Sequence, residues 1–357
     1  MKQTLRPNSF QPRKGRIPPS TALTAVAVGV IFVLLGCSLF SPTPVPLIFP
    51  TLVLAPQPSA LPELTAAPPP PPPGQAGGKI AFTCQVFRVQ AADQICLMNS
   101  DGSGFRRLTS DDSHRHFYPS IAADGQSVVY VSNASGKKDP AGSVYYDIYE
   151  MNLGTGEVRQ VTSELGILTA PEVSPDGTQI VFTNSDGPHE AVWLMGRDGS
   201  NPHRIFGSDT VSGWDPTWSP DGKQILFAST APEGGIQLFI VNADGTSPRQ
   251  ASNLPNLRGR SDWSVRNQIT TYSGEAWARE IFIFSAENPA ATQVSPAGGN
   301  GQGPSFSPDG NWIAFTAYYG HLHEADGCEI YIMRIDGTDL TRLTENTYCD
   351  WQPRWGP

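Results

Sequence analysis

Two pairs of histidines have a spacing that can bind a metal ion, His114-x-His116 and His321-x-His323. On a β-strand, residues two positions apart point to the same side, so both imidazole rings of a pair could reach one metal ion. Both pairs fall in segments expected to be loops, where the neighbouring acids equally mark solvated turns. We favour solvated turns, keep a metal site as the alternative, and expect no cofactor.

The sequence lacks the short motifs of common catalytic sites. It contains no Gly-x-Ser-x-Gly, no Gly-rich phosphate loop and no His-Glu-x-x-His. The acids that recur belong to Asp-Gly pairs such as Asp221-Gly222 and Asp244-Gly245, which lack the paired acids of a calcium loop. An Asp that recurs with every repeat is expected to cap a turn, and its Gly to adopt a positive φ. We therefore predict no catalytic residue.

The Asp-Gly pairs separate short apolar runs that are typical of β-strands. Four such runs follow one another at 216–219, 224–228, 237–241 and 247–251. Asp221-Gly222 separates the first two runs and Asp244-Gly245 the last two. An Asp-Gly turn between alternating apolar residues is the strongest short-range signal for a β-hairpin. The segment predicts a four-stranded antiparallel unit.

This unit recurs along the chain. Its first turn is seen at Asp124, Asp176, Asp221 and Asp309, with spacings of 52, 45 and 88 residues, and 88 is close to twice 44. The missing copy is expected near residue 265, where Ser264–Ile269 has lost the Asp-Gly. A period of about 40–50 residues with four strands per unit indicates a β-propeller.

The two ends of the repeat region complete one blade. Gly78–Phe82 matches a second strand that lacks a first, and Trp351–Trp355 matches a first strand with nothing after it. We predict that residues 78–357 form an all-β, six-bladed β-propeller of four-stranded antiparallel blades. The ring closes when the C-terminal strand pairs into the first blade, which removes the exposed sheet edges.

The repeat resembles that of the TolB-like family. The pattern is Pro-x-Trp/Phe-Ser-Pro-Asp-Gly, an Ile-x-Phe strand, and Asp-Gly-Thr followed by Leu-Thr, and its best copies are Pro304–Thr344 and Pro216–Ser252. The resemblance implies a propeller that binds a protein or peptide of the cell envelope without catalysis. Related propellers accompany peptidase or lyase activities. The alternatives are therefore a carbohydrate or small-ligand binder, or a propeller lyase or hydrolase with a metal at its long-loop face. We expect a stand-alone propeller, without the α/β domain of TolB or a hydrolase domain.

Residues 1–37 have the features of a secretory signal. Five basic residues and no acid precede the apolar stretch Thr21–Gly36, which is short for a transmembrane helix. Leu34-Leu35-Gly36-Cys37 resembles a bacterial lipobox, which implies a lipid on Cys37. An uncleaved membrane anchor is the alternative. Either interpretation places the protein outside the cytoplasm, at the cell surface or in the periplasm.

Residues 38–77 are expected to be a disordered linker, because thirteen prolines fall between Pro42 and Pro73. Without the five basic residues of the leader, the chain carries 19 positive and 33 negative charges, a net charge of −14. This acidity argues against a nucleic acid partner. We expect a monomer that binds an envelope protein or peptide.

Four cysteines remain besides Cys37. Outside the cell, an even number suggests two disulfides with three possible connectivities. In the propeller, Cys84 ends a second strand beside Cys96, which opens the third strand. Cys328 opens the third strand of the last blade, and Cys349 precedes the closing strand. We predict Cys84–Cys96 and Cys328–Cys349, with a metal site as the alternative.

The same topology identifies a possible binding face. Connections after second strands and between blades lie on one face and are the long ones, and the first strands begin there at the mouth of the central channel. Long loops on a rigid scaffold usually carry function. The predicted ligand-binding residues at the mouth are Phe117, Tyr118, Trp214, Asp215, Arg260, Trp351 and Gln352. Aligned positions of other blades carry Thr169, Ala170, Gln302 and Gly303. Packing of the Trp side chains between blades is the alternative.

Overall fold

The computed structural model describes residues 76–85, 92–185, 189–320, 327–346 and 348–357. The signal segment with Cys37, nearly all of the linker, and the pair His321 and His323 lie outside the described residues. Within the described residues, no helix has the length and hydropathy needed to cross a lipid bilayer.

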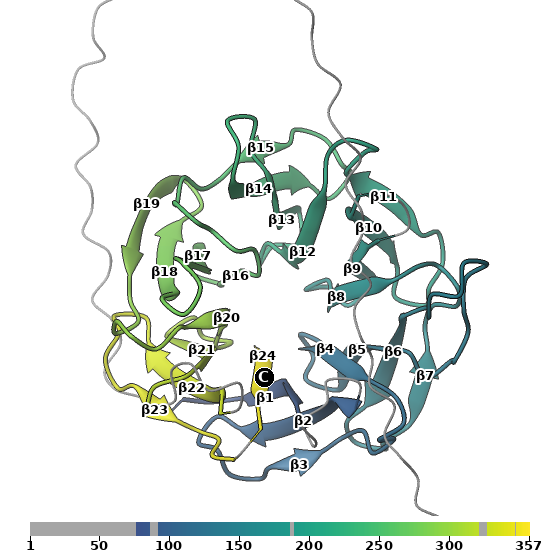
Figure 1. The fold of residues 1–357 in the computed structure, drawn as a ribbon, viewed down its shortest axis with the longest axis horizontal. Helices are drawn as coiled ribbons and strands as arrows, with labels where there is room; N and C mark the ends of the chain where they lie inside the picture. The colour runs from purple at the N-terminus through teal and green to yellow at the C-terminus, as the bar shows by residue number, and fades with distance from the viewer. Residues whose placement is uncertain (1–75, 86–91, 186–188, 321–326, 347) are drawn as a thin grey trace, which may run out of the picture. The chain divides into compact units, whose positions relative to one another are not determined.

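The described strands form six four-stranded antiparallel sheets arranged as the blades of a ring (Figure 1), which confirms the predicted fold. The first, innermost strands are β24 (Asp350–Gly356), β4 (His116–Ile121), β8 (Leu168–Val173), β12 (Gly213–Trp218), β16 (Asp262–Trp263) and β20 (Gln302–Phe306). The second strands are β1 (Lys79–Cys84), β5 (Ser127–Ser132), β9 (Gln179–Asn184), β13 (Gln224–Thr230), β17 (Gln268–Ser273) and β21 (Trp312–Ala317). The third strands are β2 (Gln94–Asn99), β6 (Asp147–Asn152), β10 (Ala191–Gly196), β14 (Ile236–Asn242), β18 (Glu280–Ser285) and β22 (Glu329–Arg334). The outer strands are β3 (Arg106–Arg107), β7 (Val158–Gln160), β11 (His203–Phe206), β15 (Arg249–Gln250), β19 (Asn288–Gln293) and β23 (Thr341–Arg342).

The ring closes as the sequence predicts. Strand β24 from the C-terminus pairs antiparallel with β1, with Trp355 opposite Ile80. The Trp355 indole N–H also donates to the carbonyl of Gly77, with a distance of 2.8 Å. The degenerate copy near residue 265 is a genuine hairpin, in which Trp263 of β16 pairs with Ile269 of β17.

Apolar side chains of neighbouring blades pack against one another and form the core. The Phe of the Ile-x-Phe pattern is fully buried in four second strands, as Phe82, Phe182, Phe227 and Phe315. Phe227, for example, packs in a cluster with Val181 of the preceding blade. Each blade thus buries its faces against its neighbours, which explains why the unit repeats around a ring.

A polar contact that the sequence analysis missed joins the third strand of several blades to the segment after the outer strand. The hydroxyls of Thr162, Ser295 and Thr344 donate to Asp147, Glu280 and Glu329, with distances of 3.2, 2.6 and 2.6 Å. Each hydroxyl also accepts the backbone N–H of the residue after its acid. A hydroxyl side chain at this position, which is the Thr of the Leu-Thr pattern in the last blade, therefore links the segment after the outer strand to the third strand.

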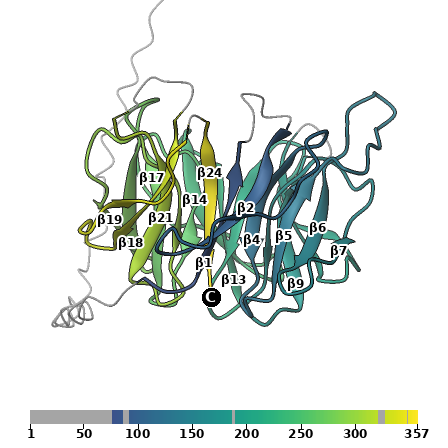
Figure 2. The ribbon, with the colours of Figure 1, turned by 90° about the horizontal axis from the view of Figure 1, so that it is seen from below.

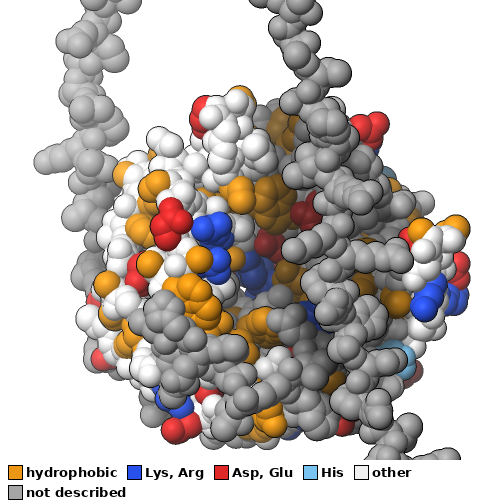
Figure 3. Space-filling view, viewed as in Figure 1, with side chains coloured by type: hydrophobic (Ala, Val, Ile, Leu, Met, Phe, Trp, Pro, Cys, Tyr) orange, Lys and Arg blue, Asp and Glu red, His pale blue; other side chains and the backbone are white. Residues whose placement is uncertain are grey.

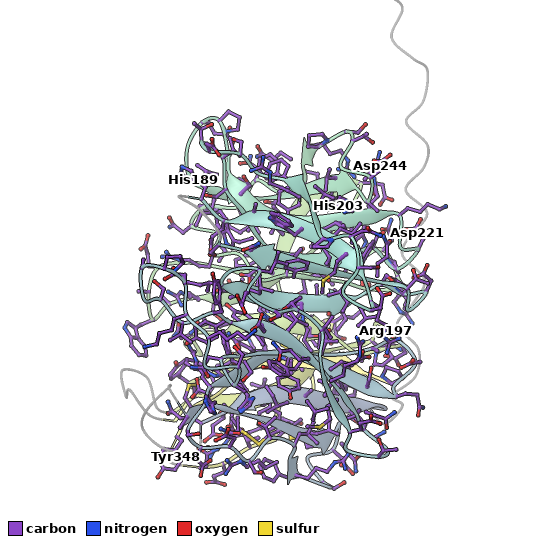
Figure 4. All side chains as sticks on the ribbon, turned by 90° about the vertical axis from the view of Figure 1, so that its right-hand side faces the viewer. His189, Arg197, His203, Asp221, Asp244 and Tyr348 are labelled. Atoms are coloured by element: carbon purple, nitrogen blue, oxygen red, sulfur yellow. A yellow bond between two sulfur atoms is a disulfide. The ribbon has the colours of Figure 1, made fainter. Side chains whose placement is uncertain are left out.

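The Asp-Gly turns have the structural role that the repeats indicate. The Asp221 Oδ1 atom accepts hydrogen bonds from the Ser219 hydroxyl at 2.7 Å and the Lys223 N–H at 3.1 Å. Gly222 has a φ of +69°, a conformation that glycine adopts without a steric penalty. Figure 4 places Asp221 and Asp244 at one face of the propeller and His189 at the other.

The longer loops lie on the face opposite these turns. Figure 2 shows them along its upper edge, with the C-terminus at the lower edge. They include the connection 133–146 between β5 and β6 and the connection 251–261 between β15 and β16.

Both predicted disulfides are present. Cys84 is bonded to Cys96 across β1 and β2, and Cys328 is bonded to Cys349. The second bond lies where the last blade meets the closing strand β24. It therefore secures the seam of the ring, as the topology predicts.

Candidate functional site

Five of the seven residues predicted for the channel mouth line one pocket on the long-loop face. They are Tyr118, Asp215, Arg260, Trp351 and Gln352. Gln302 and Gly303 join them from β20, and the pocket has a volume of about 130 Å³. Figure 3 views this face, which is hollowed at its centre, where basic and acidic side chains gather.

The other two predicted residues lie outside this pocket. Phe117 is buried in an apolar cluster with Leu168 of the next blade, and the Arg115 guanidinium stacks on its ring. Trp214 packs against the cluster that includes Leu226 and Trp263. Both aromatic rings pack between blades, and this packing positions the neighbouring residues Tyr118 and Asp215.

A backbone irregularity points side chains at the channel. Tyr118, Ala170, Asp215, Gly303 and Gln352 occupy the same position of five first strands, and all have a φ between +49° and +56°. At each of them the strand pairing shifts register, as in a β-bulge. A bulge re-aims a side chain that would otherwise follow the pleat. Each of the five residues precedes a proline, which lacks the N–H that a regular ladder would use.

Gln352 connects two blades at the mouth. Its Oε1 atom accepts hydrogen bonds from the Tyr118 backbone N–H at 3.1 Å and from the Thr83 hydroxyl at 2.9 Å. These bonds fix the orientation of the Gln352 amide. They also hold β24, β1 and β4 together at the rim of the pocket.

Arg260 forms the cationic part of the pocket. Its side chain is 95% buried, and its Cζ atom lies 4.9 Å from the centre of the Tyr118 ring. Its backbone N–H donates to Asp215 Oδ2 at 3.2 Å. Burial and the Arg354 charge lower the pKa of Arg260 to about 10, so it stays charged at neutral pH. Burial raises the pKa of Asp215, and the nearby Arg260 opposes this shift.

Tertiary structure adds residues to the pocket that the sequence analysis missed. Tyr272, Thr316 and Tyr318 come from second strands or the loops after them. Burial raises the pKa of Tyr272 to about 12, so its hydroxyl remains protonated. Alignment of first strands alone cannot identify these residues, because they reach the channel from behind the innermost strand.

Below the mouth, three charged side chains join first strands across the channel. The Arg354 guanidinium lies 3.6 Å from Glu172 Oε2 and 3.5 Å from Asp262 Oδ1. Burial raises the pKa of Glu172, and Arg354 opposes this shift. A second cavity of about 310 Å³ opens beyond this cluster on the tight-turn face, between Trp218, Trp355 and equivalent residues. The described part of the channel thus has an opening at each end and an ion-paired cluster between them.

The described residues contain no group of three or more His, Cys, Asp or Glu placed to hold a metal ion. The two histidines of the first pair have different environments. The His114 Nδ1 atom lies 2.5 Å from Asp111 Oδ2, whereas His116 is buried at the start of β4. Burial lowers the pKa of His116 to about 4.

Comparison with known proteins places these features in a family. A family model described as the TolB beta propeller domain matches residues 73–276. An uncharacterized protein of Agrobacterium fabrum is 28% identical over 65% of this chain and 76% of its own length. An uncharacterized peptidase of Bacillus subtilis is 28% identical over 46% of this chain, and a TolB homologue of Chlorobium luteolum is 27% identical over 36%. The matched regions span only 32% and 27% of those two relatives.

Solved structures show the same fold. TolB from Acinetobacter baumannii has a TM-score of 0.67 at 21% identity, over 80% of this chain and 68% of that one. A putative TolB from Agrobacterium tumefaciens has a TM-score of 0.58 at 16% identity, over 80% of this chain and 100% of that one.

Proposed function

Because the chain belongs to the TolB beta-propeller family, we propose that it is a non-catalytic binding module that holds a protein or peptide at the mouth pocket. Relatives with this propeller include proteins named TolB homologues. The propeller supplies a rigid scaffold, and the long loops around its mouth can determine which partner fits.

One observation carries this proposal. Tyr118, Asp215, Arg260 and Trp351 converge from different blades on a single concave site. Buried Arg, Tyr and Trp side chains are the types that dominate the energy of binding interfaces. A site assembled from several blades at the centre of a long-loop face is suited to one inserted segment of a partner.

The proposal extends to the location of the protein. Residues 1–37 act as a lipoprotein-type signal, and Cys37 carries the lipid that anchors the chain to a bacterial membrane. Residues 38–77 form a proline-rich spacer that holds the propeller away from the membrane, outside the cytoplasm. The basic leader, the apolar stretch and the lipobox pattern support this arrangement.

Affinity capture from the envelope of the source organism tests the binding function. The bait is the full chain, compared with the variants Arg260→Gln and Trp351→Phe. Arg266→Gln is the matched control, because Arg266 lies in a turn on the opposite face, where its Nε atom donates to the carbonyl of Asp309. We expect a partner that wild type and control retain and that the mouth variants lose. Equal retention by all four proteins would refute the mouth as the binding site.

Labelling with a radioactive fatty acid tests the anchor. We expect wild type to incorporate the label and to sediment with membranes, and Cys37→Ala to do neither. Incorporation that persists in Cys37→Ala would contradict the proposed lipidation site.

A further inference from the structure

The mouth pocket contains hydrogen-bond donors that have no partner among the described residues. They are Nε and Nη1 of Arg260, the indole Nε1 of Trp351 and the hydroxyl of Thr316. The Arg260 and Thr316 side chains are only 5% and 3% exposed. Folded proteins pair the great majority of buried polar groups. Three unsatisfied side chains around one cavity therefore indicate that a ligand completes the site.

Comparison between blades shows that Thr316 differs from its equivalents. Thr83 and Thr183 occupy the same position of their second strands, each after a buried Phe. Their hydroxyls accept the backbone N–H groups of Tyr118 and Asp215, with distances of 3.3 and 3.0 Å. Within the described part of the chain, the Thr316 hydroxyl has no such bond. The repeat therefore satisfies this hydroxyl in two blades and leaves it free at the pocket.

The Asp215 carboxylate does not form an ion pair with the Arg260 guanidinium. Its Oδ2 atom accepts the backbone N–H of Arg260, and no ion pair within 4 Å joins the two side chains among the described contacts. The other buried guanidinium of the channel, Arg354, already has two carboxylates beside it. Arg260 is therefore a buried cation whose guanidinium pairs with no carboxylate among the described residues.

We propose that the mouth pocket binds a carboxylate, either an Asp or Glu side chain or the free C-terminus of a peptide. A carboxylate only accepts hydrogen bonds, and the unpaired groups of Arg260, Trp351 and Thr316 all donate them. Its single negative charge matches Arg260, which supplies the one guanidinium among the described residues that line the pocket, and Asp215 in the same pocket disfavours a dianion such as phosphate. A volume of about 130 Å³ admits one side chain.

This inference rests on the proposed function for the partner that presents the carboxylate, but its test needs no partner. The full ¹⁵N-labelled chain is titrated with two matched pairs of blocked tripeptides. Acetyl-Ala-Glu-Ala-amide against acetyl-Ala-Gln-Ala-amide tests a side-chain carboxylate. Acetyl-Ala-Ala-Ala with a free C-terminus against its amide tests a terminal carboxylate. The signal is the Trp351 indole N–H resonance, assigned by its loss in Trp351→Phe.

We expect the acid of at least one pair to shift the Trp351 resonance and to bind at least about tenfold more tightly than its amide, since hydrogen bonds to charged groups are the stronger ones. Thr316→Val keeps the shape and every charge of the pocket. It should lower the affinity for the acidic peptide about tenfold. Thr292→Val on the exposed strand β19 is the matched control and should have no effect. Arg260→Lys should weaken binding as well, because an ammonium lacks the planar fork.

Equal binding of acids and amides, no shift of Trp351 with any peptide, or binding of inorganic phosphate in place of the acids would overturn the carboxylate site. None of these results would affect envelope capture that depends on Arg260 and Trp351. Conversely, the peptides could bind while capture proves independent of the mouth. The two experiments therefore separate failure of the carboxylate site from failure of the proposed function.

Discussion

Asp350 and Glu329 bring two carboxyl groups into the interior where the ring closes, with 2% and 1% of their surfaces exposed. Asn346 contacts both, through its backbone N–H to Glu329 and its amide to Asp350 Oδ2 at 2.8 Å. Burial and then the Glu329 charge raise the pKa of Asp350 to about 7. The seam of the propeller therefore contains a carboxyl group that titrates near neutral pH.

This shift predicts how stability depends on pH. The folded protein holds the Asp350 proton more tightly than the unfolded chain, where the pKa is near 3.8. The contribution of Asp350 to the free energy of unfolding is therefore full below about pH 4 and is lost as the pH rises to about 7. We expect Asp350→Asn to become more stable relative to wild type between pH 5 and pH 8, by on the order of 2–4 kcal/mol. Urea unfolding at both pH values measures the difference.

A matched control isolates this residue. The lowered pKa of buried His116 gives an opposite trend, since stability is lost as the pH falls from about 6.5 to about 4. The relevant quantity is therefore the difference between variant and wild type. Asp209→Asn replaces an exposed acid and is measured in parallel as the comparison variant. A difference between Asp350→Asn and wild type that does not change with pH would contradict a raised pKa of Asp350.

At the scale of the strand, the left-handed residue before each first-strand proline determines which side chains face the channel. Tyr118, Asp215 and Gln352 owe their place in the pocket to this irregularity. A positive φ is unfavourable for a residue with a Cβ atom and persists where the surrounding structure requires it. The backbone conformation at the bulge is therefore required to form the site, in addition to the side chains themselves.

Ala170 allows the backbone effect to be measured without changing the pocket, because it has a φ of +49° and does not line the pocket. Ala170→Gly relieves about 1–2 kcal/mol of left-handed strain. It loses about 0.5–1 kcal/mol through chain entropy and about 0.8 kcal/mol through the buried methyl group. We expect little net change in the free energy of unfolding.

Ala314→Gly is the comparison variant for this measurement. Ala314 is fully buried in β21, and its φ is not positive. The same two losses apply there without relief of strain, so this variant should be about 1–2 kcal/mol less stable than Ala170→Gly. Denaturant unfolding of both variants measures the change in the free energy of unfolding. Equal changes for Ala170→Gly and Ala314→Gly would argue against strain at position 170.

At the scale of the whole molecule, the ring is closed by contacts that are distant in sequence. Arg354 of β24 bridges Glu172 of β8 and Asp262 of β16 across the channel. The pairing of β24 with β1 and the bond between Cys328 and Cys349 act at the seam. Together these contacts join both ends of the described propeller to its opposite side.

Removal of the Arg354 charge should be costly. Arg354→Gln removes the cation from Glu172 and Asp262, whose side chains are only 17% exposed, and we expect a loss of about 3 kcal/mol in the free energy of unfolding. Lys223→Gln is the control, because the Lys223 ion pair with Asp221 is largely exposed and should contribute nothing measurable. Urea unfolding compares the two variants with wild type. A cost for Arg354→Gln no larger than that of the control would exclude a structural role for this cluster.

The disulfide at the seam should stabilise the ring. Cys328 and Cys349 are 21 residues apart, and a loop of this length corresponds to about 3 kcal/mol in the chain-entropy description. We expect the double variant Cys328→Ser/Cys349→Ser to lose about this amount in guanidinium unfolding. In this double variant, a reductant should change the stability only by breaking the remaining disulfide between Cys84 and Cys96. An unchanged unfolding midpoint in the double variant would contradict the prediction.

The repeat spacing, the Asp-Gly turns and the two end fragments were enough to predict six blades, the closing strand and both disulfides. These features depend on local turn chemistry and on a period that can be counted along the chain. The alignment of first strands also predicted five residues of the pocket, because every blade places its first strand at the channel.

Only the tertiary structure decided which aromatic residues reach the pocket. Phe117 and Trp214 pack between blades, whereas Tyr272, Thr316 and Tyr318 enter from second strands and loops. The left-handed bulges, the unpaired donors and the pairing of Arg354 also appeared only in three dimensions. Side-chain direction and polar pairing depend on neighbouring blades, which are tens to hundreds of residues away in the sequence, and no local pattern records those contacts.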